Sequence, residues 1–340
     1  MNRILVTGGA GFIGSALIRN LVSEGVNVLN VDKLTYAGNL DSLKDIHQKK
    51  NYQFANYDIN DVSAIKKLFK SFKPDAVMHL AAESHVDRSI SGPEEFIRTN
   101  ILGTFNLLSV SKDYYDSMST GSKKFIFHHI STDEVYGELK NDTDFFKEDT
   151  NYDPSSPYSA SKASSDHLVR AWNRTFNLPV VITNCSNNYG PYQNSEKLIP
   201  KIITNCLKEQ KIPIYGSGKQ IRDWLYVDDH VDALKLVVES GKNGETYNIG
   251  GNNEISNINV ANIICEFLNN FIPSTKRKVK DYKQLIEYID DRPGHDRRYA
   301  IDASYINKTL GWAPNETFES GISKTIQWYV ENNWWWEEKS

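Results

Sequence analysis

The chain has 340 residues, of which 39% are hydrophobic and 24% are charged, so it is long enough to bury a sizeable core. Its 43 acidic and 39 basic residues leave a net charge of −4, which argues against nucleic acid or an anionic membrane as a partner. The length predicts one large domain with a lobe, or two domains.

Cysteine usage and hydropathy indicate the compartment. Cys185, Cys206 and Cys265 lie far apart and lack metal-ligand spacing, so we expect reduced thiols and no metal site. Reduced thiols are usual in the cytosol. No apolar run approaches the roughly 20 residues of a membrane span, and the chain opens on a strand pattern that leaves no room for a signal peptide. We therefore expect a cytoplasmic protein.

The chain begins with a predicted strand–helix–strand unit. Residues 3–7 form a short apolar strand, a helix follows to about residue 24, and residues 26–31 form a second strand. The glycines between the first strand and the helix match the G-x-x-G-x-x-G variant of the dinucleotide-binding fingerprint: Gly8, Gly11 and Gly14. Glycine there permits a tight turn and lets a pyrophosphate approach the backbone at the helix N-terminus.

An acidic residue at the end of the second strand indicates which dinucleotide binds. Asp32 follows Gly14 by 18 residues, close to the spacing of about 20 expected for a ribose-binding acid. A carboxylate there would accept from a ribose 2′-hydroxyl and repel a 2′-phosphate. The sequence therefore predicts NAD rather than NADP, with Lys33 as the one nearby feature against it.

Strands and helices continue to alternate toward the middle of the chain. Strands are predicted at residues 52–57 and 75–80, and helices at 61–72 and 99–112. Asp58 and Ile59, at the end of the first of these strands, could meet an adenine ring. The small residues Ala81 and Ala82 follow the second strand, where a chain would pass close to a cofactor.

The central strand leads into a run of hydrogen-bonding side chains. Residues 124–130 are apolar enough for a buried parallel strand that ends near Ser131. Thr132, Asp133 and Glu134 then lie at the carboxyl edge of the sheet, where open α/β sheets bind ligands. Taken singly, such a run is most often a helix cap. Two carboxylates exceed what hydride transfer needs, so they suggest a second reaction.

A predicted helix over residues 157–176 carries a Tyr-x-x-x-Lys pair. Tyr158 and Lys162 are four residues apart and therefore share one face. A phenol has an ordinary pKa of about 10, which a nearby cation lowers, so this pair predicts a poised base. The hydroxyl of Thr132 could hydrogen-bond the phenolate and the same substrate oxygen. By itself the pair is more commonly a surface feature.

The pattern changes after this helix. The predicted elements are strands at 178–183 and 246–249, helices at 197–209 and 228–239, a turn at 187–191, and a hairpin-like segment from Pro213. We divide the chain into an NAD-binding domain, residues 1–185, and a largely substrate-binding lobe, residues 186–340, with segments near 225–250 returning to the first domain. The predicted fold class is α/β: a Rossmann-type doubly wound parallel sheet with a smaller mixed C-terminal lobe.

The C-terminal part contains cations suited to an anionic substrate: Lys197, Lys201, Arg222, Arg292 and Arg298. Most such cations are solvated surface charges. Arg222, near Trp224, and Arg292, before a Pro-Gly pair, are less typical of a plain surface. The run Trp334-Trp335-Trp336 could be a binding patch, although we expect it to dock the last helix.

With these motifs placed, the chain resembles the extended short-chain dehydrogenase/reductase family, and most closely its dTDP-glucose 4,6-dehydratases. The resemblance spans nearly the whole chain, through segments 7–14, 79–89, 131–137, 158–162, 186–191, 196–200, 222–230 and 291–296. The Thr132-Asp133-Glu134 triplet is its most specific part. Related epimerases lack the acid pair, and related decarboxylases and GDP-mannose dehydratases have serine in place of the aspartate. Asn184 departs from the family arginine, which we interpret as structural.

This resemblance implies an NAD-dependent hydro-lyase that converts dTDP-glucose to dTDP-4-keto-6-deoxyglucose and water. It implies that Tyr158, aided by Lys162 and Thr132, takes the proton of the carbon-4 hydroxyl while hydride passes to NAD. Glu134 then removes the carbon-5 proton, Asp133 protonates the departing carbon-6 hydroxyl, and the hydride returns to carbon 6. Because NAD is regenerated, we expect it to be tightly bound.

The resemblance also implies two sets of contact residues. The cofactor set is Gly8, Gly11, Phe12, Ile13, Gly14, Asp32, Lys33, Leu34, Thr35, Asp58, Ile59, Leu80, Ala81, Ala82, Ser84, Thr99, Tyr158, Lys162 and Asn188. The substrate set is His85, Thr132, Asn187, Lys197, Leu198, Pro213, Tyr215, Arg222, Asn257, Arg292 and His295. From its position alone, His85 is equally well explained by a bond to loop backbone.

Two alternatives stay open at the level of sequence. The first is another nucleotide-sugar enzyme of this family, namely a UDP-glucose dehydratase, an epimerase or a decarboxylase; Asp133 argues against the last two. The second is a non-catalytic NAD-sensing regulator, a class that tends to lose the tyrosine, the lysine or the acids, all present here. Nothing in the sequence distinguishes thymine from uracil as the base.

We also expect a homodimer. The predicted helices at 99–112 and 159–176 carry a second apolar stripe beyond what one sheet face can cover: Leu102, Phe105, Leu108, Leu168, Ala171 and Trp172. In this superfamily such helix pairs form a four-helix interface.

Overall fold

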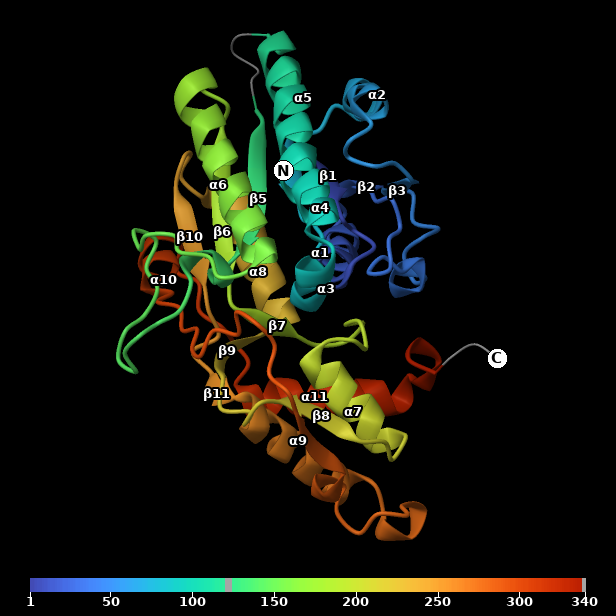
Figure 1. Cartoon of the computed structure of the whole chain (residues 1–340). Helices are drawn as coiled ribbons and strands as arrows, with labels where there is room; N and C mark the ends of the chain where they lie inside the picture. The colour runs from blue at the N-terminus through green and yellow to red at the C-terminus, as the bar shows by residue number, and fades with distance from the viewer. Residues whose placement is uncertain (120–123, 338–340) are drawn as a thin grey trace.

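A seven-stranded parallel sheet forms the centre of the molecule in the computed structural model, which describes residues 1–119 and 124–337 (Figure 1). Across the sheet the strands are β3 (Tyr52–Ala55), β2 (Asn27–Val31), β1 (Arg3–Thr7), β4 (Ala76–His79), β5 (Ile126–Thr132), β6 (Val180–Cys185) and β10 (Thr246–Ile249). The strand order reverses between β1 and β4, which makes a topological switch point at the carboxyl edge. The doubly wound Rossmann-type fold predicted from the sequence is confirmed.

Helices cover both faces of this sheet because its strands are apolar on both sides. Ile4 and Val6 of β1 pack against α1 (Phe12–Ser23) and α8 (Val227–Ser240). Leu5, between them, points to the opposite face. The helices on that opposite face are α2 (Val62–Phe72), α5 (Thr104–Ser117) and α6 (Pro157–Phe176). The bounds of α6 agree with the predicted helix at 157–176.

The helix predicted at 99–112 is part of a longer helical run. It begins at α4 (Pro93–Phe96), passes through the π-helical segment η2 (Ile97–Gly103) and continues as α5. Pro93 occupies the first helical turn, where its missing N–H costs no hydrogen bond, so the helix starts earlier than predicted. Short π-helical segments inside helices are frequent at functional sites.

The C-terminal lobe contains two small sheets. In the first, β9 (Ile221–Tyr226) pairs antiparallel with β11 (Glu254–Ser256) and parallel with β7 (Asn187–Tyr189). In the second, β8 (Ile212–Tyr215) pairs in parallel with β12 (Ile286–Ile289). The hairpin-like arrangement predicted from Pro213 is therefore wrong. A parallel pair needs a long crossover, and here that crossover contains the helix α9 (Asn257–Phe271).

Three helices pack around these small sheets: α7 (Leu198–Leu207), α9 (Asn257–Phe271) and α11 (Phe318–Glu331). Figure 1 shows this lobe beneath the large sheet, with the end of the chain beside it. The remaining short elements are η1 (Leu40–Leu43), α3 (Val86–Ser91), η3 (Asp133–Tyr136), η4 (Ser274–Lys276), η5 (Tyr282–Leu285), α10 (Ser304–Leu310) and η6 (Asn333–Trp335). Within the described ranges, no helix is both long and apolar enough to cross a bilayer.

Candidate active site

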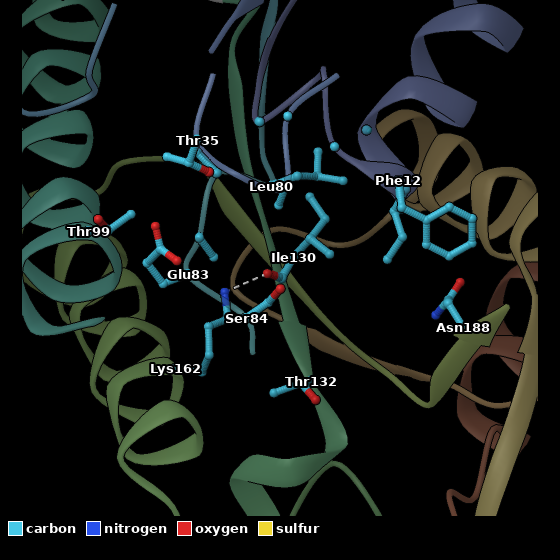
Figure 2. A pocket seen from close by; sticks show the side chains of 18 of the residues that line it. Phe12, Thr35, Leu80, Glu83, Ser84, Thr99, Ile130, Thr132, Lys162 and Asn188 are labelled. Carbon is cyan, nitrogen blue, oxygen red and sulfur yellow. Dashed lines mark hydrogen bonds between the residues drawn. The ribbon is translucent and has the colours of Figure 1, made fainter. Parts of the chain in front are cut away.

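A cavity of about 300 Å³ lies along the carboxyl edge of the large sheet, at its switch point, and extends toward the C-terminal lobe (Figure 2). One wall comes from the end of β2 and from the loops that follow β1, β2, β3 and β4. The other comes from the end of β5, the start of α6 and the loop between β7 and α7. We call these the cofactor wall and the chemical wall.

The glycine-rich turn of the cofactor wall leaves no room for side chains. Gly8 has a φ of +72°, and a Cβ on it would lie 2.6 Å from the amide nitrogen of Ala81. A Cβ on Gly14 would lie 2.3 Å from the carbonyl oxygen of Gly8. Gly11 begins α1 without a side-chain cap, so the N–H groups of the first helical turn face this region unsatisfied. These features fit the diphosphate of a dinucleotide.

Asp32 and Lys33 have separate partners on the cofactor wall. The Asp32 carboxylate accepts from the backbone N–H groups of Leu34 at 2.8 Å and Ala10 at 2.9 Å. Burial raises the pKa of Asp32, while these two hydrogen bonds oppose the rise. Lys33 Nζ lies 3.4 Å from Asp58 Oδ2, so its charge is already engaged by a carboxylate. The arrangement fits a ribose 2′-hydroxyl better than a 2′-phosphate.

Nearly all of the cofactor set lines the cavity. Leu34 does not; its side chain is exposed, its φ is +57°, and its contribution is the N–H group that it donates to Asp32. Several lining residues were not predicted from the sequence, among them Glu83, Gln193 and Asn194. Glu83 belongs to the small-residue motif after β4 and could have been found there, whereas the other two lie in a loop without a local signal.

The Thr132-Asp133-Glu134 triplet stands at the end of β5 and on the turn that follows it. Thr132 is the N-terminal cap of η3: its hydroxyl oxygen accepts from the Glu134 N–H group at 3.3 Å and lies 3.3 Å from Asp133 Oδ1. The predicted alternative role as a helix cap is therefore also real for Thr132. It does not apply to Asp133 and Glu134, which line the cavity.

The start of α6 delivers the tyrosine and lysine to the same place. Ser156 and Ser159 form a reciprocal capping box that fixes this start. Tyr158, one residue into the helix, is buried and packs edge-on against Phe96. Lys162 Nζ donates to the carbonyl oxygen of Ile130 at 2.8 Å, which ties α6 to β5 (Figure 2).

The two acids differ in electrostatic environment. Burial raises the pKa of Asp133 well above the ordinary carboxyl value, and the negative charges of Glu134 and Asp223 raise it further. Burial also raises the pKa of Glu134, but the cations Arg292, Arg222 and Lys197 oppose that rise. Neighbouring carboxyls pushed apart in this way are suited to one acid and one base.

The tyrosine environment corrects one prediction. The sequence predicts that Lys162 lowers the pKa of Tyr158, but in the protein alone burial raises that pKa well above 10, and Glu134 raises it further. A hydrogen bond from Thr132 opposes the rise. Burial also lowers the pKa of Lys162. Desolvation therefore dominates the pKa of Tyr158 in the protein alone.

The substrate set divides into two groups. Thr132, Asn187 and Lys197 line the cavity, and Lys197 Nζ donates to the carbonyl oxygen of Ser84 at 3.1 Å. The other members are not among the described residues that line it: His85, Leu198, Pro213, Tyr215, Arg222, Asn257, Arg292 and His295.

Several of these residues nevertheless converge on Asp87 of α3. Arg292 Nη1 lies 3.2 Å from Asp87 Oδ1, and the Tyr215 hydroxyl donates to Asp87 Oδ2 at 3.1 Å. The ring centroids of His295 and Tyr215 are 6.1 Å apart. Asp87 thus gathers side chains from distant segments of the lobe.

Two further predicted contacts, His85 and Arg298, have partners within the protein. His85 Nε2 lies 3.7 Å from a Glu196 carboxylate oxygen. Arg298 is buried and pairs with Glu254 at 2.6 Å, so it holds the lobe together rather than facing the cavity. Within the described residues, no group of three metal-binding side chains is assembled.

Comparison with known proteins gives a consistent result. A family model described as GDP-mannose 4,6 dehydratase matches residues 5–325. The dTDP-glucose 4,6-dehydratase of Shigella flexneri is 58% identical over 345 residues, which cover 98% of this chain and 94% of that protein.

Solved structures resemble the chain over its whole length. The dTDP-glucose 4,6-dehydratase of Bacillus anthracis, in complex with NAD, is 43% identical with a TM-score of 0.87 and 99% coverage of both chains. That of Streptomyces venezuelae, with NAD and TYD bound, is 40% identical with a TM-score of 0.89, covering 98% of this chain and 99% of the other.

Proposed function

The chain belongs to the dTDP-glucose 4,6-dehydratases of the extended short-chain dehydrogenase/reductase family, and from this premise we propose how its residues divide the reaction. The enzyme is an NAD-dependent hydro-lyase that converts dTDP-glucose to dTDP-4-keto-6-deoxyglucose and water. Bound NAD supplies a hydride acceptor for carbon 4 and a hydride donor for carbon 6. The cofactor wall holds it through the glycine turn, the start of α1 and Asp32.

The chemical wall moves three protons. Tyr158 takes the proton of the carbon-4 hydroxyl, with Thr132 oriented by η3 toward the same oxygen and Lys162 held against β5 as the nearby cation. The carbon-4 ketone acidifies the carbon-5 proton, which the Glu134 carboxylate takes. Asp133 donates a proton to the carbon-6 hydroxyl, which leaves as water. The ketone at carbon 4 stays in the product. Glu134 returns its proton to carbon 5 as carbon 6 is reduced, and the proton taken from the carbon-4 hydroxyl balances the one that Asp133 gives to the departing water.

The observation that carries this proposal is the difference between the two acids. The elimination needs a protonated acid and an ionised base side by side. Asp133 has the more strongly raised pKa, and its Oδ2 has no hydrogen-bond partner among the described residues. Glu134 has three cations near it. This difference supports Asp133 as the acid and Glu134 as the base.

The direct test is the product formed from two substrates. The purified protein is incubated with dTDP-glucose and, separately, with UDP-glucose, and the products are separated by chromatography. We expect the 4-keto-6-deoxy sugar from dTDP-glucose, and more slowly or not at all from UDP-glucose. An epimerised sugar would favour the epimerase alternative. No product from a folded protein that contains NAD would favour the regulator.

We also propose that the enzyme is a homodimer through α5, α6 and the π-helical segment before α5. Ile97, Leu102 and Phe105 are exposed on this face, with exposed fractions of 56%, 48% and 40%. Leu108 belongs to the internal core and is withdrawn from the predicted stripe, because its side chain is completely buried. Light scattering should give twice the chain mass for the wild-type protein. Leu102→Glu places a charge on the exposed apolar face and should lower the measured mass toward that of the monomer. A wild-type monomer at micromolar concentration would refute the proposal.

A further inference from the structure

The tryptophans at the end of the chain surround one side chain of the loop between β7 and α7. After α11 the chain turns back in η6, and the ring centroid of Tyr192 lies 4.5 Å from that of Trp328, 5.3 Å from Trp335 and 6.5 Å from Trp334. Tyr192 has a φ of +66°, a backbone conformation that is unfavourable for a residue with a side chain. The aromatic contacts therefore hold it in a conformation that it would not adopt alone.

The same residues fix the backbone of this loop. The carbonyl oxygen of Gln193 accepts from the Tyr329 hydroxyl at 2.6 Å and from Trp335 Nε1 at 3.2 Å. Gln193 and Asn194 line the cavity, and so does Lys197 at the end of the loop. The loop thus has the tryptophans behind it and the site in front of it.

The contacts also cross from the C-terminal segment to the cofactor-binding part of the molecule. Arg19 of α1 lies with its guanidinium carbon 4.2 Å from the centre of the Tyr192 ring. Lys44 Nζ lies 3.5 Å from the centre of the Trp334 ring. Both cations face the rings in cation–π geometry, on segments that flank the glycine turn and Asp32.

The same loop also contacts residues of the N-terminal domain through Asn194 and Glu196. Arg88 Nη2 lies 2.7 Å from Glu196 Oε1, and its guanidinium carbon lies 3.8 Å from the centre of the Tyr36 ring. Asn194 Nδ2 donates to the Tyr36 carbonyl oxygen at 3.5 Å. The loop is therefore attached to the cofactor wall in front and to the tryptophans behind.

We propose that Trp334 and Trp335 are positioning residues which, through Tyr192 and Gln193, hold the loop of residues 190–197 over the cofactor and so slow the release of NAD. The proposal rests on the NAD-dependent function above. A cofactor that is regenerated in every turnover does not need to leave the enzyme between turnovers. Slow release is therefore compatible with this reaction. We call the contacts of Trp334 and Trp335 with Tyr192, Gln193 and Lys44 the clasp. The clasp also positions Lys197 for the substrate.

The test compares two tryptophans of the same run. Trp335 contacts the loop, whereas Trp336 Nε1 donates to the Tyr329 carbonyl oxygen at 2.8 Å and its ring faces Lys208, both within the C-terminal lobe. NAD release from the purified holoenzyme is followed by exchange with radiolabelled NAD. Trp335→Ala should release NAD about 10-fold faster than wild type, since it loses ring contacts and a hydrogen bond, while Trp336→Ala should stay near the wild-type rate.

Further readouts separate positioning from folding. Trp335→Phe should recover part of the slow release because it keeps a ring beside Tyr192. In Trp335→Ala the KM for dTDP-glucose should rise, because Lys197 lies on the loop that loses its support. The kcat should change little, since the proposed catalytic residues lie on β5, η3 and α6. Thermal unfolding of the two alanine variants should be lowered to a similar extent.

A second variant, at Lys44 on the cofactor-binding side of the clasp, provides a test that does not depend on the folding of a tryptophan variant. Lys44 is exposed, so Lys44→Met should fold and release NAD a few-fold faster, and Lys44→Arg should not. Equal release rates in wild type, Trp335→Ala and Lys44→Met would overturn the inference, and so would equal acceleration in both tryptophan variants. If the wild-type protein retained no NAD and formed no product, the proposed function itself would fail.

Discussion

The two walls of the cavity differ in whether their carboxyl oxygens have hydrogen-bond partners. On the cofactor wall, the side-chain oxygens of Asp32 accept from two backbone N–H groups, and Lys33 is paired with Asp58. On the chemical wall, Asp133 is buried with one oxygen that has no hydrogen-bond partner among the described residues. Satisfied groups favour binding in one geometry, whereas unsatisfied buried groups are poised to exchange protons.

This contrast predicts different consequences of mutation on the two walls. Changes on the chemical wall should alter rates at saturating substrate, because the proposed acid and bases lie there. Changes on the cofactor wall should alter affinity and leave the rate at saturating cofactor nearly unchanged.

Removal of the Tyr158 hydroxyl should abolish the first oxidation. Tyr158→Phe takes away the base for the carbon-4 hydroxyl, and we expect turnover to fall by about 10⁴-fold, the upper end for a positioned base. Absorbance should show no NADH when dTDP-glucose is added. Tyr57→Phe, a matched change on the cofactor wall, should keep nearly full activity. Comparable losses in both variants would contradict the division between the walls.

The two acids should stop the reaction after the first oxidation. Glu134→Gln and Asp133→Asn should each lower turnover by about 10²- to 10³-fold while NADH accumulates, because the base or the acid of the elimination is missing. If elimination is stepwise, Asp133→Asn should still exchange the carbon-5 hydrogen with deuterated solvent, and Glu134→Gln should not; a concerted elimination would block exchange in both. Near-normal turnover of either folded variant would refute its assigned role.

On the cofactor wall, Asp32→Asn should weaken NAD binding without slowing the chemistry. It removes a charge that accepts from the ribose, so the Kd for NAD should rise about 10- to 100-fold and the preference over NADP should shrink. Titration of the cofactor-free protein with each dinucleotide measures this. A change in kcat at saturating NAD would show that the cofactor wall also controls catalysis.

The smallest effect concerns stability and its pH dependence. Because the pKa of Asp133 is higher in the folded protein than in the unfolded chain, the folded state holds the proton longer, and stability falls as pH rises from the ordinary carboxyl range toward the raised pKa. Asp133→Asn removes this pH-dependent contribution. At neutral pH its free energy of unfolding should exceed that of wild type by on the order of 1 kcal/mol, and it should unfold at a higher temperature. Below the ordinary carboxyl pKa this advantage should vanish in thermal melts.

Local patterns were sufficient for the cofactor wall and the backbone of the catalytic stretch. The spacing of Gly8, Gly11 and Gly14 between two apolar strands implies the turn, because only glycine permits that close approach. The helix at 157–176 was predictable from its own residues, since its cap and its periodicity are encoded there. Its bounds place Tyr158 and Lys162 on one face without any tertiary information.

The proposed chemistry of the chemical wall depends on tertiary contacts that no local pattern reports. The roles of Asp133 and Glu134 depend on Arg222 and Arg292, which are distant in sequence and come close only when the lobe folds. The same holds for the parallel pairing of β8 with β12 and for the contact of Trp335 with Gln193. Sequence spacing reports which residues share a turn or a face; a pKa depends on burial and on charges from every segment packed nearby, and those are set only by the complete fold.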